Sequence, residues 1–214
     1  MSRKYNNLYV EVTPVKRLTS SSIQEVVAVA RASFGHEASE AMDQDTIEHV
    51  MEADYVSLGR LGGQVIGVAM TRRLEQPQAF EWMGGIIHPS YQSGGLMPKL
   101  LASQSWRLER DEVVAYTRNP KIAQLLRRMG TEVVPFDNDD ALHELALSMP
   151  SAQEIDGVVY HIGRYGEDGL YGDEDPATLP MQRDGIPFMQ QFQELQDVRN
   201  TLVIAARLHK NNPI

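Results

Sequence analysis

One segment of the sequence combines residue types that could bind an anion and move a proton. It begins at Glu81, continues through Gly84, Gly85 and Pro89, and reaches Gly94-Gly95 just before an apolar-periodic stretch that predicts a helix. A strand that stops at a proline and turns through glycine into a helix points several backbone N–H groups at one spot, together with the positive end of the helix dipole. A pyrophosphate would fit there. On the glycines alone, an ordinary turn explains the segment equally well.

Strands and helices alternate around this segment, on what we expect to be a mixed sheet. Gly62-Gly63 between two alternating runs predicts a hairpin. Ser22, with Glu25 three residues later, predicts a capping box at the start of the first helix. The expected strands are 8–18, 55–61, 64–71, 79–88, 113–117, 131–136, 158–162 and 198–208, and the expected helices are 23–34, 40–53, 97–110, 120–129 and 140–149.

Two motifs in this order of elements resemble the GNAT superfamily of N-acetyltransferases, over about residues 8–136. The family's strand of the form Val-x-Pro, followed by Arg/Gln-x-x-Gly-x-Gly/Ala, is matched by Ile87-His88-Pro89 and then Gln92-Ser93-Gly94-Gly95-Leu96-Met97. Its next strand ends in Asn and leads to a helix that ends in Gly eleven positions later, as Asn119 and Gly130 do here. The resemblance implies an α/β (α+β) fold, with a mixed, mostly antiparallel central sheet flanked by helices and a C-terminal extension.

The resemblance also implies an activity and a set of binding residues. The protein would be an N-acetyltransferase that moves an acetyl or other acyl group from acetyl-CoA, its co-substrate, to a primary amine. The main chain of Ile86 and Ile87 would pair with the pantetheine arm, and Asn119 would meet the cofactor near the parted strands. The loop that holds the pyrophosphate would consist of Gln92, Ser93, Gly94, Gly95, Leu96 and Met97.

Glu81 lies six residues before Ile87, where several members of this family place a general base. Aminolysis of a thioester needs a neutral amine, so a carboxylate there would take the ammonium proton, directly or through water. A purely structural role for Glu81 is as well supported as the role of general base. Glu81 is then either a solvated strand residue or the partner of Arg72 or Arg73 in an ion pair on the neighbouring strand.

Three residues depart from the family pattern. Met97 stands where Gly or Ala is usual, and its side chain would reduce the room for a phosphate. Pro98 offers no N–H to an anion. Leu126 occupies the place of a Tyr that protonates the departing thiolate in many members. These departures motivate the alternative function: a catalytically weak or inactive protein of the GNAT fold, which binds acyl-CoA or has a regulatory role.

The charge of the chain is concentrated in one region. The 214 residues include 20 Lys and Arg against 29 Asp and Glu, a net charge of −9. Residues 137–197 hold 14 of the acids and two of the bases, which leaves +3 for the remainder. We therefore predict a core of residues 1–136 and an acidic part, 137–214, that completes the sheet within the same domain and carries a long loop, 164–187. An acidic chain disfavours nucleic acid and favours a cationic acceptor, either a small molecule or a peptide amine.

Other residue types exclude whole classes of chemistry. The sequence has no cysteine, so thiolate metal sites, disulfides and an acyl-cysteine intermediate are excluded, and direct attack by the amine is expected. The six histidines lack metal-ligand spacing, and we expect no metal. There is no run of about 18 apolar residues and no leader, so we expect a cytoplasmic protein that does not enter a membrane. Folds of this kind commonly form a homodimer through the C-terminal strand region.

Overall fold

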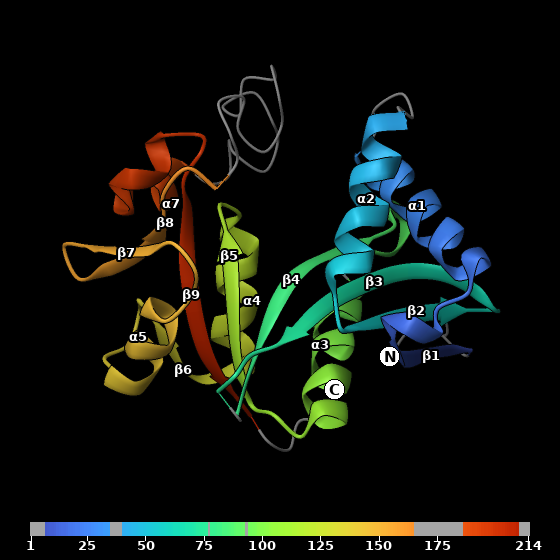
Figure 1. Ribbon diagram of the computed structural model, residues 1–214, viewed down its shortest axis with the longest axis horizontal. Coiled ribbons are helices and arrows are strands. Elements are labelled where there is room, and N and C mark those ends of the chain that lie inside the picture. The colour runs from blue at the N-terminus through green and yellow to red at the C-terminus, as the bar shows by residue number, and fades with distance from the viewer. Residues whose placement is uncertain (1–6, 35–39, 77, 93, 165–185, 210–214) are drawn as a thin grey trace. The chain divides into compact units, whose positions relative to one another are not determined.

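The computed structural model describes residues 7–34, 40–76, 78–92, 94–164 and 186–209 (Figure 1). These residues form two compact units. The first unit reaches to Asp111, and the second unit extends from Glu112 to His209. Among the described helices, none is both long and apolar enough to cross a membrane.

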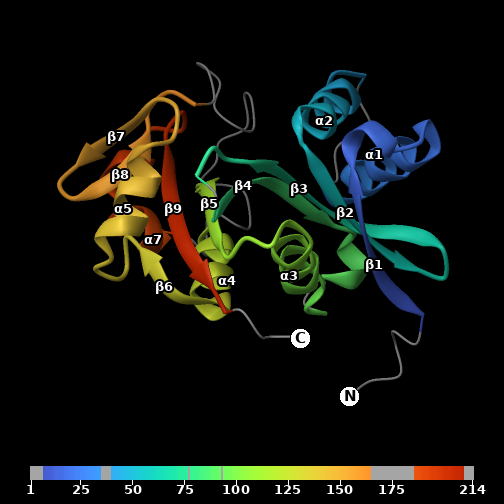
Figure 2. The same ribbon diagram turned by 60° about the horizontal axis from the view of Figure 1, so that its bottom comes forward.

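The first unit is an antiparallel sheet with helices on both faces. Each strand pairs with the next along the chain. Helices α1 and α2 lie on the opposite side of this sheet from α3 (Figure 2). Val68 and Met70 pack with residues of α1, whereas Ala69 packs with α3. The elements are β1 (Leu8–Pro14), η2 (Val15–Arg17), α1 (Ser20–Phe34), α2 (Glu40–Glu52), β2 (Tyr55–Leu61), β3 (Gln64–Arg73), β4 (Ala79–Ile87), η3 (Pro89–Tyr91) and α3 (Leu96–Leu108).

Of the hairpin turn and the capping box predicted for this unit, the structure confirms only the turn. The predicted hairpin is confirmed, because Gly62 and Gly63 join β2 to β3 with φ values of 58° and 89°. The predicted capping box is wrong. Helix α1 begins at Ser20, and Thr19 Oγ1 accepts the N–H of Ser22 at 3.1 Å. Glu25 instead accepts two hydrogen bonds from the mostly buried side chain of Arg60 on β2.

A β-bulge interrupts the pairing of β3 with β4. Met70 is paired with Gly84 and Thr71 with Trp82, so Met83 is an extra residue on β4. The indole Nε1–H of Trp82 donates to the Gly84 carbonyl at 2.7 Å, across the bulge. A bulge bends its strand and changes the direction of nearby side chains, and bulges are common beside active sites.

The second unit is built around β9, which is antiparallel to β5 on one side and to β6 and β8 on the other. Strand β7 pairs with β8. Seven of the eight residues of β9 are buried, so this strand forms the centre of the unit's core. The elements are β5 (Glu112–Thr117), α4 (Pro120–Met129), β6 (Gly130–Val134), α5 (Asp140–Leu147), β7 (Ala152–Ile155), β8 (Val158–His161), α7 (Ile186–Gln191), η5 (Gln193–Gln196) and β9 (Thr201–Leu208).

Most predicted elements are present, and the predicted fold class is confirmed by antiparallel strands flanked by helices. Strand β7 was missed. Its signal was Asp156-Gly157, an Asp-Gly pair with φ values of 52° and 78°, which is typical of a two-residue hairpin turn. The last strand begins at Thr201, three residues later than expected. Of the expected loop 164–187, residues 165–185 lie outside the described residues. The division into 1–136 and 137–214 stays a prediction.

Candidate active site

Glu81 is a fully buried carboxylate on β4, paired across the strands with Arg72. Its Oε2 accepts hydrogen bonds from Arg72 Nε at 3.0 Å and from Nη2 at 2.5 Å. Its Oε1 is buried and has no hydrogen-bond partner among the described residues. The ion pair with Arg72 is therefore present. Arg73 instead donates to the hydroxyl of Tyr55.

The Arg72–Glu81 pair lies on the sheet face that α1 and α2 cover. Arg72 is two residues beyond Met70 on β3, and side chains at alternate positions share a face. A buried carboxylate needs a balancing charge and hydrogen bonds, and Arg72, which is 43% exposed, provides both to one oxygen. The second oxygen keeps its capacity to accept.

At the end of β4, neighbouring residues direct their main-chain N–H and C=O groups to opposite sides of the strand. His88 N–H donates to the Ile66 carbonyl at 2.9 Å. Because main-chain groups alternate sides along an antiparallel pair, those of Ile86 are directed at β3 and those of Ile87 away from it. Of the two residues predicted to pair with a pantetheine arm, Ile87 has the outward-directed groups.

Two side chains already bind the Ile87 carbonyl. Ser33 Oγ, near the end of α1, lies 3.1 Å from it and shares its one hydroxyl proton with the Val29 carbonyl at 2.7 Å, and Gln92 Nε2 donates to it at 3.2 Å. Nothing in the local sequence of Ser33 indicates its contact with a strand 54 residues away. Any amide that pairs with the Ile87 carbonyl would share it with these donors or displace them.

The turn into α3 leaves the first N–H groups of that helix without a side-chain cap. Its N-cap is Gly95, in the left-handed conformation at φ 70°, and the first turn carries no acidic residue. In contrast, the described helices α4 and α5 are capped by Asn119 and Asp139. Gly94 is exposed, while Ser93 lies outside the described residues. Uncapped N–H groups at a helix start favour an anion.

The first turn of α3 packs on glycines of the sheet. Leu96 lies over Gly59 and Gly67, and the Met97 thioether lies against Gly85. A Cβ on Gly67 would be 2.8 Å from a Leu96 methyl group and 2.5 Å from Ile87 Cδ1, so these side chains would have to move to admit any larger residue. The Met97 thioether lies on the sheet, and the expectation that the Met97 side chain reduces the room for a phosphate stays a prediction.

Replacing Gly85 by Ala should weaken binding of acetyl-CoA about twofold to threefold, because the new methyl group forces the flexible Met97 thioether, at the start of α3, to move. The added Cβ would lie 2.5 Å from Met97 Cε and 2.9 Å from its Sδ. Isothermal titration with acetyl-CoA measures the change. Gly84→Ala is the matched control, because its nearest contact is Met70 Cε at 3.3 Å. Equal weakening by both variants would contradict the prediction.

Asn119 and Leu126 belong to the second unit. Asn119 Oδ1 accepts the Lys121 N–H at 2.9 Å, which caps α4, and the Asn119 N–H donates to Thr117 Oγ1 at 2.8 Å. Contact of Asn119 with a cofactor stays a prediction. Leu126, where the family often has a Tyr, is fully buried in the core, so no acid is provided from this position.

Several acids of the region 137–197 have partners inside the second unit. Asp139 caps α5 and pairs with Arg207 at 2.9 Å. Asp197 is held by hydrogen bonds from the Arg199 side chain and N–H, which lower its pKa to about 2. These acids therefore serve the fold. Among the described residues, no group of three or more acidic, His or Cys side chains could hold a metal ion.

Comparisons with known proteins find similarity in structure alone. No protein-family model matches the sequence, and no curated protein sequence matches it. The ribosomal-protein-S18-alanine N-acetyltransferase of Escherichia coli is 10% identical, with a TM-score of 0.51 over 96% of this chain and 97% of that one. The IAA acetyltransferase of Bacillus cereus is 14% identical, with a TM-score of 0.44 over 94% and 99%.

A third structure, the PaiA N-acetyltransferase of Thermoplasma acidophilum in complex with coenzyme A, is 14% identical. Its TM-score is 0.45, over 61% of this chain and 93% of that one. At these identities the likeness concerns the fold and not the activity. The fold of the chain is similar to that of the Escherichia coli N-acetyltransferase, over nearly the whole length of both chains.

Proposed function

We propose that the protein is an N-acetyltransferase that moves an acetyl group from acetyl-CoA to a primary amine by direct attack. The observation that carries this proposal is the buried Glu81 carboxylate with one oxygen left to accept a proton. It stands on the strand that leads, through the glycine turn, into the uncapped start of α3. The GNAT fold supports the same activity.

The residues of the turn fit the phosphate groups of acetyl-CoA. Gly94 is exposed and Gly95 is left-handed, so the backbone can approach an anion closely. The N–H groups at the start of α3 would donate to it, and Lys99 adds a positive charge in the first turn. The outward main chain of Ile87 would pair with the pantetheine arm. Acetyl-CoA supplies an acetyl group activated as a thioester.

The chemistry then needs one base. The Glu81 carboxylate takes the proton of the acceptor's ammonium group, directly or through water, and so supplies the neutral amine. The amine nitrogen forms the new bond to the acetyl carbon, the C–S bond breaks, and the electron pair leaves on the CoA sulfur. Without cysteine, the chain has no thiol to form an acyl-cysteine intermediate.

Titration calorimetry with acetyl-CoA tests the binding step. We expect saturable binding, because the turn offers free donors, followed by release of CoA thiol when a panel of primary amines is added. Absence of binding up to millimolar concentrations of acetyl-CoA would overturn the proposal. Release without any amine would indicate hydrolysis instead of transfer.

A second candidate is a GNAT-fold protein that binds acyl-CoA without turnover. It is favoured by the two hydrogen bonds with which Arg72 holds Glu81, and by the buried Leu126 where an acid is usual. In this case the titration shows binding, while no amine of the panel releases thiol.

The amine acceptor, the cellular location and the oligomeric state are proposals as well. We propose a small-molecule or peptide amine, cationic before it loses its proton, and neither nucleic acid nor membrane as partner. A cytoplasmic location agrees with the absence of cysteine. A homodimer agrees with the way in which folds of this kind commonly assemble.

A further inference from the structure

Three side chains of the second unit share one face of its sheet. Tyr116 on β5 is paired with Val203 on β9, and His161 on β8 is paired with Thr201 on β9. Paired residues of antiparallel strands point to the same face, as do alternate residues of one strand. The Tyr116 and His161 rings confirm this with an edge contact at 5.4 Å between centroids.

Two polar atoms of this cluster are buried without a partner. His161 Nδ1 and Thr201 Oγ1 have no hydrogen-bond partner among the described residues, and Thr201 is fully buried. They belong to directly paired residues on adjacent strands. A buried polar atom is costly unless it is hydrogen-bonded, so two such atoms on paired residues indicate a place for a ligand's polar group.

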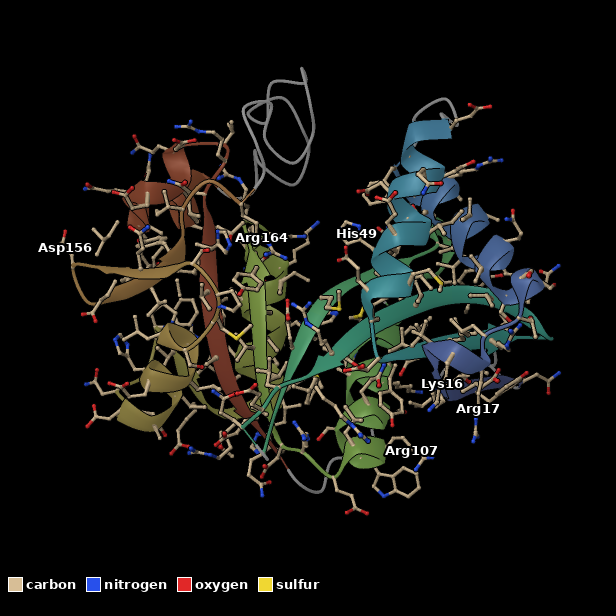
Figure 3. The ribbon with its side chains drawn as sticks, viewed as in Figure 1. Lys16, Arg17, His49, Arg107, Asp156 and Arg164 are labelled. Atoms are coloured by element: carbon tan, nitrogen blue, oxygen red, sulfur yellow. The ribbon has the colours of Figure 1, made fainter. Side chains whose placement is uncertain are left out.

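Arg164 brings a positive charge to the same cluster. Its guanidinium carbon lies 4.1 Å from the centroid of the Tyr116 ring, and Figure 3 shows it beside β5. Within the part of the chain that the structure describes, no carboxylate pairs with Arg164. Its main chain is held in place by Gly163, which is left-handed at φ 68° and donates its N–H to Asn200 Oδ1 at 2.9 Å.

The electrostatics favour a ligand with one negative charge. Burial and the nearby Arg164 lower the pKa of His161 and outweigh the main-chain groups of Ile162 and of His161 itself, which raise it, so His161 is neutral near pH 7. Arg164 is then the only cation of the cluster. A neutral His and a Thr hydroxyl can both donate hydrogen bonds to the second oxygen of a planar anion that the guanidinium binds.

We propose that Tyr116, His161, Arg164 and Thr201 form a binding site for a small organic carboxylate. The Arg164 guanidinium pairs with the carboxylate, His161 in its Nδ1–H tautomer and Thr201 donate to it, and the Tyr116 ring keeps the guanidinium in place. The site lies within the second unit, so its test requires no acetyl-CoA and does not depend on the proposed acetyl transfer.

The test compares three probes by NMR of the histidine ring signals, with the His161 signal assigned through His161→Gln. The probes are 3-phenylpropionate, phenethylamine, which replaces the carboxylate by an ammonium group, and inorganic phosphate. We expect 3-phenylpropionate to shift the His161 signal in a saturable way, phenethylamine to leave it unchanged, and phosphate to bind more weakly. No shift by 3-phenylpropionate at its solubility limit would overturn the proposal, as would equal binding of phenethylamine or of phosphate.

Three variants locate the site. Arg164→Gln should weaken binding of 3-phenylpropionate at least about tenfold, because a charge-assisted hydrogen bond is lost. Thr201→Val preserves the shape of the buried side chain and should weaken binding several-fold. Arg107→Gln, at an exposed position on α3 of the first unit, removes the same charge and should change nothing. Equal affinity of Arg164→Gln and the unaltered protein would place the carboxylate elsewhere.

Discussion

Replacing Glu81 by Gln is expected to lower the rate of acetyl transfer by about a hundredfold or more, because the amide cannot take a proton from the acceptor. Gln has nearly the same shape, and its carbonyl oxygen can still accept the hydrogen bonds that Arg72 donates to Oε2. Affinity for acetyl-CoA, measured by calorimetry, should therefore stay the same. The rate is measured as release of CoA thiol with an amine that the protein acetylates.

Glu75→Gln is the matched control. Glu75 is exposed after the end of β3 in the same unit, so the loss of its charge should leave the rate unchanged. Unfolding midpoints of both variants show whether the buried substitution is tolerated. A rate for Glu81→Gln equal to that of the unaltered protein, with the fold intact, would exclude Glu81 as the base.

Replacing Arg118 by Met is expected to lower the free energy of unfolding by about 3 kcal/mol or more. Arg118 is 3% exposed and donates to the carbonyls of Asp197 at 2.5 Å, Asn200 at 2.6 Å and Leu195 at 2.6 Å. Met fills a similar volume but donates no hydrogen bond, so three main-chain acceptors before β9 lose their donor. Denaturant unfolding followed by circular dichroism measures the loss.

Arg199→Met tests whether any arginine near Asp197 has this effect. Arg199 is 49% exposed and binds the Asp197 carboxylate, which is 34% exposed. Such surface ion pairs contribute about 0 to 1 kcal/mol, so this variant should unfold close to the unaltered protein. Similar losses of unfolding free energy in the two variants would mean that the hydrogen bonds of Arg118 to the buried carbonyls contribute no more stability than a surface ion pair.

Local sequence patterns were sufficient for most elements of the fold. The turns at Gly62-Gly63 and before α3 depend on backbone conformations that glycine alone adopts easily, so the residue type indicates the turn. The cap of α1 was placed wrongly because Thr19 and Ser22 have the same chemistry, and the choice between them depends on where the helix begins.

The candidate site was predictable only in part. Its turn residues follow one another in the chain. An ion pair of Glu81 with Arg72 or Arg73 is one of the predicted alternatives, because their strands are neighbours, and the structure selects Arg72. Ser33 and Arg118 were not foreseen. Their contacts with Ile87 and with residues 195–200 span 54 to 82 positions, and no local pattern encodes such a separation.

By itself, the sequence determined most of the strands and helices, where glycine turns the chain toward α3, and that thiol chemistry is absent, because these follow from residue type and short-range spacing. Only the tertiary structure decided that Glu81 is buried with one oxygen bound and one left over, and that Met97 packs on the sheet. It also decided that His161 and Thr201 place two unpartnered polar atoms together. The burial of a side chain and its hydrogen-bond partners depend on which distant strands become neighbours, and that is a property of the folded chain.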